Sequence, residues 1–364
     1  MYADRAFALF LAALREHVTS LKLVGRLSPP GGAARYPVGE GVELVALPYY
    51  ENLAHVRDAG PALLGSLRAF WGSLGTVDCV WLLGPHPLAL AFAALALARG
   101  KQVRLGVRQD FPAYVRSRHP NRRAMWVAAW LLEVMYRGLA KLVPVVAVGP
   151  ELAAKYARSK RVLELTVSLI HDDDVIEPDT ALQRDYDGAL RILAVGRLEE
   201  EKNPLLLADV LAELNREDAR WSLIICGEGR LQDALEARLD EHGERASAEL
   251  RGYVPFGEPL TTLYRSSHVL LHTSWTEGMP AVLPEAFAAG LPAVAADVGG
   301  ISRAVGGAAI LVPPGSPEAA ATAVRSIAAD PALRERLVRE AHAFATAHTI
   351  ETETRRVADF LSAR

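Results

Sequence analysis

The sequence predicts an α/β protein built from two doubly wound, Rossmann-like domains. Three observations support this fold class. The 364 residues suit two domains of ordinary size. Apolar residues make up 51% of the chain, enough for a core in each domain. In both halves, strand-like apolar runs alternate with helix-like stretches, as in parallel sheets that bind ligands at the carboxyl ends of their strands.

The second half shows the alternation most regularly. Strands are predicted at 190–195, 222–226, 248–252, 269–272 and 292–295. Helices are predicted at 203–215, 230–241, 258–266 and 283–289. We therefore expect a parallel sheet covered by helices on both faces.

The first half gives a similar but less regular pattern. Strands are predicted near 21–27, 42–47, 78–82, 103–107 and 145–148, and helices near 6–17, 61–74, 86–99 and 121–141. The acidic segment 171–187 is the best candidate for a linker. We expect domains at 1–175 and 176–347.

Bulk properties exclude several other classes. Cys79 and Cys226 are far apart inside apolar runs, which indicates buried thiols in a reducing compartment. There is no apolar run of membrane-spanning length and no signal-peptide pattern, so the expected location is the cytoplasm. Residues 1–170 carry a net charge of +10 and residues 171–364 one of −13, which indicates different partners for the two halves.

The segment 272–300 carries the most information about function. An apolar strand runs into a turn with Glu277, Gly278 and Pro280, and a short helix containing Glu285 ends at a glycine. A helix start after a glycine turn offers unpaired backbone N–H groups to an anion. Two glutamates would instead accept hydrogen bonds from neutral hydroxyls. Phosphate and hydroxyl groups together describe a nucleotide sugar.

This segment resembles the glutamate-pair signature of glycosyltransferase family four, whose members are retaining enzymes with the GT-B fold. The resemblance implies that Glu277, Gly278, Met279 and Pro280 hold the donor sugar and that Glu285 holds the nucleotide ribose. It also implies two facing domains with a cleft between them, the second binding the donor and the first the acceptor. The last helix, predicted at 351–361 within the segment 348–364, would pack back on the first domain. The resemblance is strongest over 190–316.

A basic pair follows the strand at 190–195. Arg197 and Lys202 lie five residues apart, between Gly196 and a helix that starts with a proline. Arginine offers a fork of donors and lysine a mobile point charge, so the two can converge on one anion. The resemblance implies that they clamp the donor diphosphate and stabilise its charge as it leaves.

Two further motifs can each be interpreted as structural or as functional. Gly227 lies in a glycine turn that lacks the third glycine of a dinucleotide fingerprint, and the resemblance places such a turn beside the nucleotide. Asp172, Asp173 and Asp174 could suggest a metal, but exposed linkers are often acidic, and the family generally needs none. We expect no metal ligands and no cofactor.

The first half offers weaker candidates for the acceptor side. His86, Arg108 and Asp110 each follow a predicted strand, although the family often has a histidine where Arg108–Asp110 stand. Four arginines (Arg116, Arg118, Arg122 and Arg123) precede a helix rich in aromatic residues. This cluster is compatible with a solvated entrance to a core helix or with an anionic membrane surface.

The family's first domain begins with a strand and a glycine loop. This chain instead opens on a helix-like pattern, and Pro30-Gly31-Gly32 is followed by a predicted strand where a helix is needed. We therefore expect the first strand and its glycine loop to be missing.

The sequence thus predicts a retaining glycosyltransferase that moves a sugar from a nucleotide-diphosphate sugar to a hydroxyl acceptor. The acceptor could be a glycan, a lipid-linked or a small molecule, and no nucleic-acid partner is expected. A GT-B nucleotide-sugar epimerase and a non-catalytic nucleotide-sugar-binding subunit remain as alternatives. Base, sugar and acceptor are left open.

Overall fold

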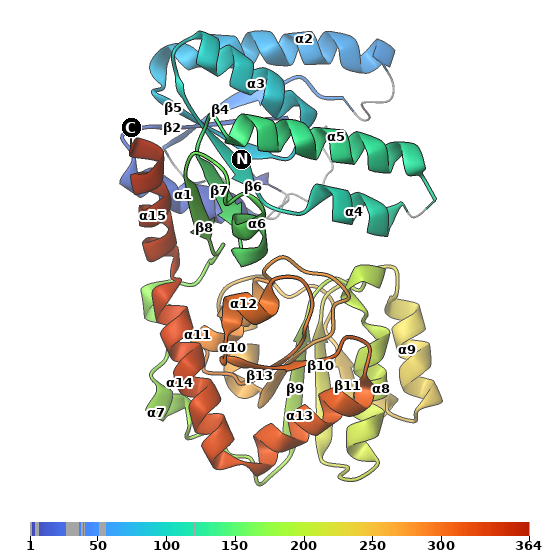
Figure 1. Ribbon diagram of the computed structural model, residues 1–364. Coiled ribbons are helices and arrows are strands. Elements are labelled where there is room, and N and C mark those ends of the chain that lie inside the picture. The colour runs from blue at the N-terminus through green and yellow to red at the C-terminus, as the bar shows by residue number, and fades with distance from the viewer. Residues whose placement is uncertain are drawn as a thin grey trace. The chain divides into compact units, whose positions relative to one another are not determined.

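The structure is a computed structural model that describes residues 2–3, 7–26, 36–37, 39, 41–50, 56–119 and 121–363. The chain divides into two compact units (Figure 1). The first comprises residues 1–167 and 351–364, and the second residues 168–350. The sequence had suggested boundaries at 175/176 and 347/348, a few residues away.

The first unit contains parallel strands in two sheets. β2 pairs with β4, and a second sheet has the order β5-β6-β7-β8. Its strands are β1 (Tyr2–Ala3), β2 (Leu21–Arg26), β3 (Tyr36–Pro37), β4 (Val42–Leu47), β5 (Cys79–Gly84), β6 (Gln102–Val107), β7 (Val145–Val148) and β8 (Val162–Leu165). Its helices are α1 (Phe7–Leu14), α2 (Val56–Ser73), α3 (Pro87–Ala98), α4 (Phe111–Arg118), α5 (Arg123–Ala140), α6 (Pro150–Lys155) and α15 (Ile350–Ser362).

The start of the chain bears on the expected missing strand. β1 pairs antiparallel with β3 and lies outside the parallel sheets, and α1 precedes β2, the first parallel strand in the described residues. Pro30-Gly31-Gly32 lies outside the described residues. The missing strand and glycine loop therefore stay a prediction.

The second unit is a six-stranded parallel sheet with the order β11-β10-β9-β12-β13-β14. Its strands are β9 (Leu190–Val195), β10 (Trp221–Cys226), β11 (Ala248–Leu250), β12 (Val269–His272), β13 (Ala293–Ala296) and β14 (Ala309–Val312). Its helices are α7 (Pro178–Ala181), α8 (Leu205–Asn215), α9 (Gln232–Glu241), α10 (Glu258–Ser266), α11 (Val282–Ala288), α12 (Ile301–Val305), α13 (Pro317–Ala329) and α14 (Pro331–Ala347). In chain order the strands run 3-2-1-4-5-6, the Rossmann order, so the strand order reverses between β9 and β12.

Alternating side chains of β9 fill two cores, one on each face of this sheet. Ile192 and Ala194 pack with α8 and α13, whereas Leu193 packs with α10 and α11. Burial on both faces explains why the strands read as continuous apolar runs in the sequence. Because both faces of the sheet are buried, the ends of β9 and β12 are held in place, and so are the starts of the loops that follow them.

The last helix, α15, makes its contacts with the first unit. Arg356 donates to the carbonyl oxygen of Glu164 at 3.1 Å, and Arg104 donates to that of Ala363. The guanidinium of Arg161 lies 4.9 Å from the centre of the Phe360 ring. Both cysteines are free; Cys226 is buried and Cys79 is half-buried.

Candidate functional site

A pocket of about 290 Å³ lies in the second unit at the carboxyl ends of β9 and β12. The segments 194–198, 271–274 and 279–282 contribute most of its lining. This is the position at which the strand order reverses, where the loops of neighbouring strands diverge and leave an opening. The sheet topology therefore predicts a ligand site here independently of any motif.

The structure brings six of the sequence-predicted donor residues into this one pocket. They are Gly196, Arg197, Lys202, Glu277, Met279 and Pro280. Gly196 and Arg197 directly follow β9, and Lys202 ends a 3-10 turn at Glu200–Lys202. The start of α11 also lines the pocket through Ala281 and Val282, with no side-chain cap on its first N–H groups.

Glu277 is the electrostatic centre of the pocket. Its Oε1 pairs with the ammonium of Lys202 and accepts a hydrogen bond from Oγ of Ser274 at 2.8 Å. Nε2 of His272 lies 3.2 Å from the same oxygen. Burial alone would raise the pKa of Glu277, but the His272 hydrogen bond and the Lys202 charge outweigh it and lower the pKa to about 2. The carboxylate is therefore ionised at every physiological pH.

His272 and Ser274 are functional candidates that the sequence analysis did not select. Both are buried, and their mutual separation is 3.0 Å, between Ser274 Oγ and His272 Nε2. The signal was present in the spacing His272-x-Ser274-x-x-Glu277 at the end of a strand, where alternating side chains share one side. Serine and carboxylate both meet the same histidine nitrogen, whereas a nucleophilic triad places them on opposite nitrogens. This cluster orients the carboxylate rather than activating the serine.

Arg197 has a different setting from Lys202. Its guanidinium pairs with Glu201 at 2.6 Å, and its side chain is 63% exposed. Lys202 is only 25% exposed and already paired within the pocket. The pocket thus has one exposed cation at its edge and one held against Glu277.

Two glycines set the shape of the loops at this site. Gly227 has φ +151° and lies against Gly196, because a Cβ at Gly227 would be 1.8 Å from the Gly196 carbonyl oxygen. Gly299 has φ +56°, and a Cβ there would be 1.9 Å from the Glu277 carbonyl oxygen. Gly227 supports the pocket wall behind Gly196, and neither Gly227 nor Gly278 belongs to the pocket lining. Gly299 was not selected from the sequence.

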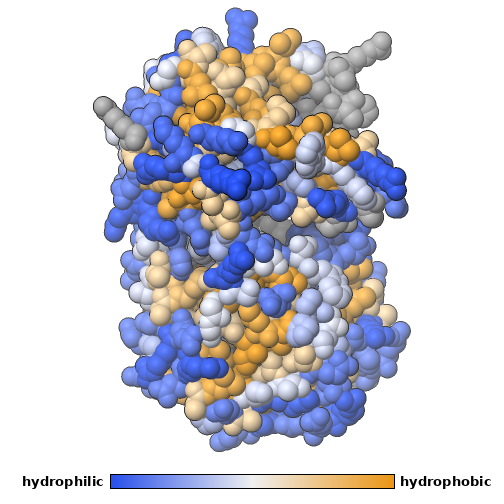
Figure 2. All heavy atoms as spheres, in the orientation of Figure 1, coloured by the Kyte–Doolittle hydropathy of each residue, from blue (hydrophilic) through white to orange (hydrophobic). Residues whose placement is uncertain are grey.

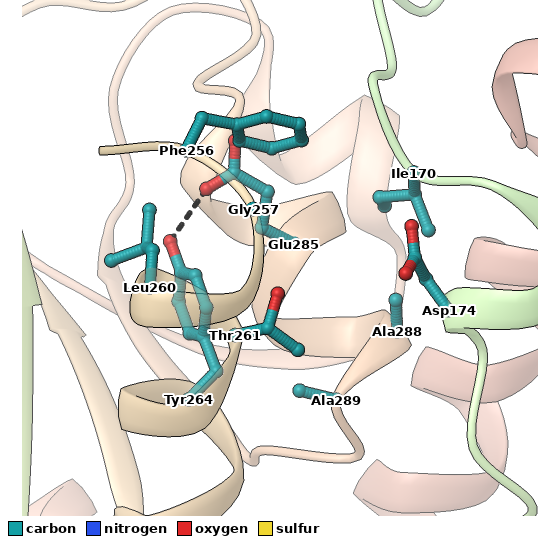
Figure 3. Close-up of a pocket in the computed structure, with 10 residues that line it drawn as sticks. All are labelled: Ile170, Asp174, Phe256, Gly257, Leu260, Thr261, Tyr264, Glu285, Ala288 and Ala289. Atoms are coloured by element: carbon teal, nitrogen blue, oxygen red, sulfur yellow. Dashed lines mark hydrogen bonds between the residues drawn. The ribbon is translucent and has the colours of Figure 1, made fainter. Parts of the chain in front are cut away.

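Glu285 lies in a second, smaller pocket of about 30 Å³, one helical turn into α11 (Figure 3). The hydroxyl of Tyr264 donates to its Oε2 at 2.7 Å, and Phe256 lines the same pocket (Figure 3). Burial raises the pKa of Glu285 to about 7, against the smaller lowering effect of the Tyr264 hydrogen bond. The two glutamates of the motif therefore lie in separate pockets and differ in charge at neutral pH.

The acceptor-side candidates of the first unit have structural partners. Nδ1 of His86 accepts from the backbone N–H of Leu88 and caps α3. The guanidinium of Arg108 lies 4.0 Å from the centre of the Phe7 ring. Asp110 caps α4 through the N–H of Ala113 and pairs with Lys155 at 3.0 Å.

The acidic run at 172–174 forms a 3-10 turn. The carboxylate of Asp174 accepts a hydrogen bond from the backbone N–H of His171 at 2.8 Å, so this aspartate has a structural role in the turn. Within the described ranges, no group of three metal-ligating side chains was found. A helix long and apolar enough to cross a membrane is likewise missing from the described ranges.

Known proteins resemble this chain in two ways. Residues 181–344 match the family model "Glycosyl transferases group 1". A glycogen synthase of Mycobacterium tuberculosis is 33% identical over 183 residues, which cover 49% of this chain and 44% of that protein. The matched part thus spans less than half the length of this relative.

Solved structures resemble the whole chain. The sucrose-phosphate synthase from Thermosynechococcus elongatus superposes with a TM-score of 0.72 at 17% identity, covering 96% of this chain and 90% of that one. HepE from Anabaena, solved in complex with UDP and glucose, superposes with a TM-score of 0.72 at 16% identity, covering 100% and 98%. At these identities the likeness shows the fold, which is the GT-B fold predicted from the sequence. Over residues 181–344, most of its second unit, the chain resembles the group 1 glycosyl transferases.

Proposed function

We propose that this protein is a retaining, metal-independent glycosyltransferase that moves a sugar from a nucleoside-diphosphate sugar to a hydroxyl acceptor. One observation carries the proposal: two cations and an ionised carboxylate share the pocket at the β9/β12 switch point. Cations suit a diphosphate, and a carboxylate fixed in its charged form suits the hydroxyls of a sugar. Few other ligands carry both groups at once.

The proposed roles follow from the charges. Arg197, exposed at the pocket edge, would bind diphosphate oxygens with its planar fork, and Lys202 would add a point charge. Both would stabilise the negative charge that builds on the diphosphate as the glycosidic bond breaks. With two cations and the start of α11 available, the proposed chemistry needs neither a metal ion nor a cofactor.

Glu277 would accept hydrogen bonds from donor-sugar hydroxyls, with the backbone around Gly278, Met279 and Pro280 completing that subsite. Its second oxygen, Oε2, remains for the sugar, because the contacts with Lys202, Ser274 and His272 converge on Oε1. Glu285 would meet the nucleotide ribose. Gly196 and Gly227 would form the wall beside the diphosphate.

The similar proteins support the donor class. HepE was solved with UDP and glucose, and the match to the glycosyl transferase family model, residues 181–344, includes the whole lining of the pocket. From that likeness we infer that the donor of this protein is a nucleoside-diphosphate sugar. Retention of the anomeric configuration is likewise extended from the family.

We assign the acceptor to the first unit, with His86, Arg108 and Asp110 as candidates. We further propose that the protein works in the cytoplasm at the inner face of a membrane, where a lipid-linked acceptor would be available. The high positive charge of the first half supports this location.

The decisive experiment is a thermal-shift screen of the intact chain with nucleoside diphosphates and their sugars. A ligand at a hundredfold excess over its Kd stabilises the folded state by about 2.7 kcal/mol, so the correct base should raise Tm by several degrees. The best donor is then incubated with the protein in EDTA, and released sugar and its anomeric configuration are followed by NMR.

Slow release of an α-linked sugar as the α-anomer, undiminished by EDTA, is the expected result. An epimerised nucleotide sugar, or binding with no turnover in a chain extended upstream, would overturn the transferase proposal. Loss of turnover in EDTA that returns with a divalent cation would overturn the metal-independent mechanism.

A further inference from the structure

The outer face of α5 carries an exposed apolar stripe that the donor chemistry does not use. Six of the twelve large apolar side chains exposed in the described part of the chain fall between residues 127 and 142. Five of these lie on α5: Val127, Trp130, Leu131, Val134 and Met135, each between 47% and 57% exposed. Figure 2 shows hydrophobic residues gathered on this part of the first unit.

The spacing of these five residues places them on one side of the helix. They follow the pattern i, i+3, i+4, i+7 and i+8, which forms a continuous strip along a helix surface. The opposite side of α5 is part of the core, where Leu132, Tyr136 and Ala140 are buried. The helix is therefore apolar on two sides, only one of which is covered by its own unit.

Basic residues flank the stripe at both ends. Arg122 and Arg123 lie at the start of α5, and Arg137 and Lys141 lie at its end; all four are exposed. Within the described residues, none of them forms an ion pair with a carboxylate. The single acidic residue of α5, Glu133, is buried on the core side and pairs with Lys155 at 3.0 Å.

We infer that the α5 stripe is a docking surface for an anionic phospholipid bilayer. The apolar residues would enter the boundary between headgroups and acyl chains, while the flanking cations meet lipid phosphates. The helix would lie flat in the interface, because its other side is fixed to the core of the first unit. Between Arg123 and Lys141 it would cover about 27 Å of the membrane surface.

Charge argues against a second copy of the chain as the occupant. In a two-fold dimer through this stripe, cations at each end of one helix would face cations of the other in either orientation. An acidic lipid surface instead complements all four cations at once. This inference deepens the proposed membrane contact and does not depend on the donor chemistry of the second unit.

The test is co-sedimentation of the intact chain with phosphatidylcholine vesicles, with and without phosphatidylglycerol, at low and high salt. We expect binding to anionic vesicles at low salt that is at least tenfold weaker for neutral vesicles and weakens as salt rises. The double variant Trp130→Gln/Met135→Gln should lose about tenfold or more of this binding. The pair Arg122→Gln/Arg123→Gln should lose about tenfold.

The matched control replaces two exposed apolar residues outside α5, in Leu64→Gln/Leu97→Gln, and should bind vesicles as the parent does. Equal losses in control and stripe variants, or no vesicle binding by the parent, would overturn the inference. So would a stripe variant that dissociates a dimer of the parent in sedimentation velocity, because a second copy would then cover the face. Thermal shift with the best nucleoside diphosphate tests the donor site separately and should be unchanged in all variants.

Discussion

The two glutamates of the same loop and helix have opposite electrostatic environments. Glu277 meets a serine hydroxyl, a histidine ring nitrogen and an ammonium group, and its pKa falls to about 2. Glu285 meets one tyrosine hydroxyl in a small pocket, and burial raises its pKa to about 7. Both carboxyl groups are largely buried, so it is their hydrogen-bond partners and nearby charges that separate them.

The difference shows that the sheet topology determines which partners each glutamate receives. Glu277 follows β12 at the switch point, where the loop after β9 supplies Lys202. Glu285 lies one turn into α11 and faces α10, which supplies Tyr264 and no cation. The larger pocket therefore holds a carboxylate that stays charged, and the smaller pocket holds a carboxyl group that titrates near neutral pH.

The largest effect is expected from Glu277→Gln. The amide keeps the shape but loses the negative charge that pairs with Lys202 and that, in the proposed mechanism, strengthens the hydrogen bonds from the sugar hydroxyls. We expect donor turnover to fall by about a hundredfold or more. The assay is release of sugar or transfer from the nucleotide sugar found by the thermal-shift screen.

Glu335→Gln is the matched control for this variant. Glu335 is a half-exposed residue of α14 that pairs with Arg339, outside the pocket. Its turnover should equal that of the parent, because exposed ion pairs contribute little. Parent-like turnover in folded Glu277→Gln would remove Glu277 from the proposed mechanism.

Much of this comparison could be predicted from the sequence, and some of it could not. The spacing of Glu277 and Glu285, the strand before them and the basic pair after β9 are local patterns, and the structure places five of the predicted strands of the second unit within one or two residues. The separation into two pockets depends on Tyr264 and Phe256, which come from another part of the chain. No local pattern pairs them with Glu285.

Other elements were missed for identifiable physical reasons. β8 was missed because a glutamate interrupts its short apolar run, VLEL, and we have no comparable reason for β14. The helix α13 is rich in alanine and α14 is rich in charged residues, so neither presents a run of large apolar side chains. For α5 the sequence left two interpretations open, a core helix with a solvated entrance and a contact with an anionic membrane, because a sequence pattern does not show which of two apolar sides is covered.

The second prediction concerns the pH dependence of stability at Glu285. Its folded pKa, about 7, lies above the ordinary value of 4.5, so the folded state binds more protons than the unfolded state between these values. The free energy of unfolding should therefore fall as pH rises from about 4.5 to 7. Glu285→Gln removes this titration, and its stability relative to the parent should rise by about 1–3 kcal/mol over that range.

Urea denaturation at several pH values measures the effect. Glu335→Gln again serves as the control, because it removes a carboxyl group that lies outside both pockets. A constant difference between Glu285→Gln and the parent across this range would show that Glu285 titrates normally, and the contrast between the two glutamates would disappear.

The smallest effect is expected from Ser274→Ala, which tests how Glu277 is kept ionised. The variant removes one of the hydrogen bonds to Oε1, at a cost of about 1 kcal/mol, while Lys202 and His272 remain. The pKa of Glu277 should then rise, but it starts at about 2, so the carboxylate stays charged at neutral pH.

Turnover of Ser274→Ala at neutral pH should accordingly fall by less than about fivefold, while the acid limb of its pH profile moves up by as much as about one unit. Ser326→Ala, which removes an exposed serine bonded to the carbonyl of Thr322, should change neither. A hundredfold loss in Ser274→Ala with an unmoved acid limb would mean that the serine contacts the substrate directly. Glu277 would then owe its charge to Lys202 and His272 alone.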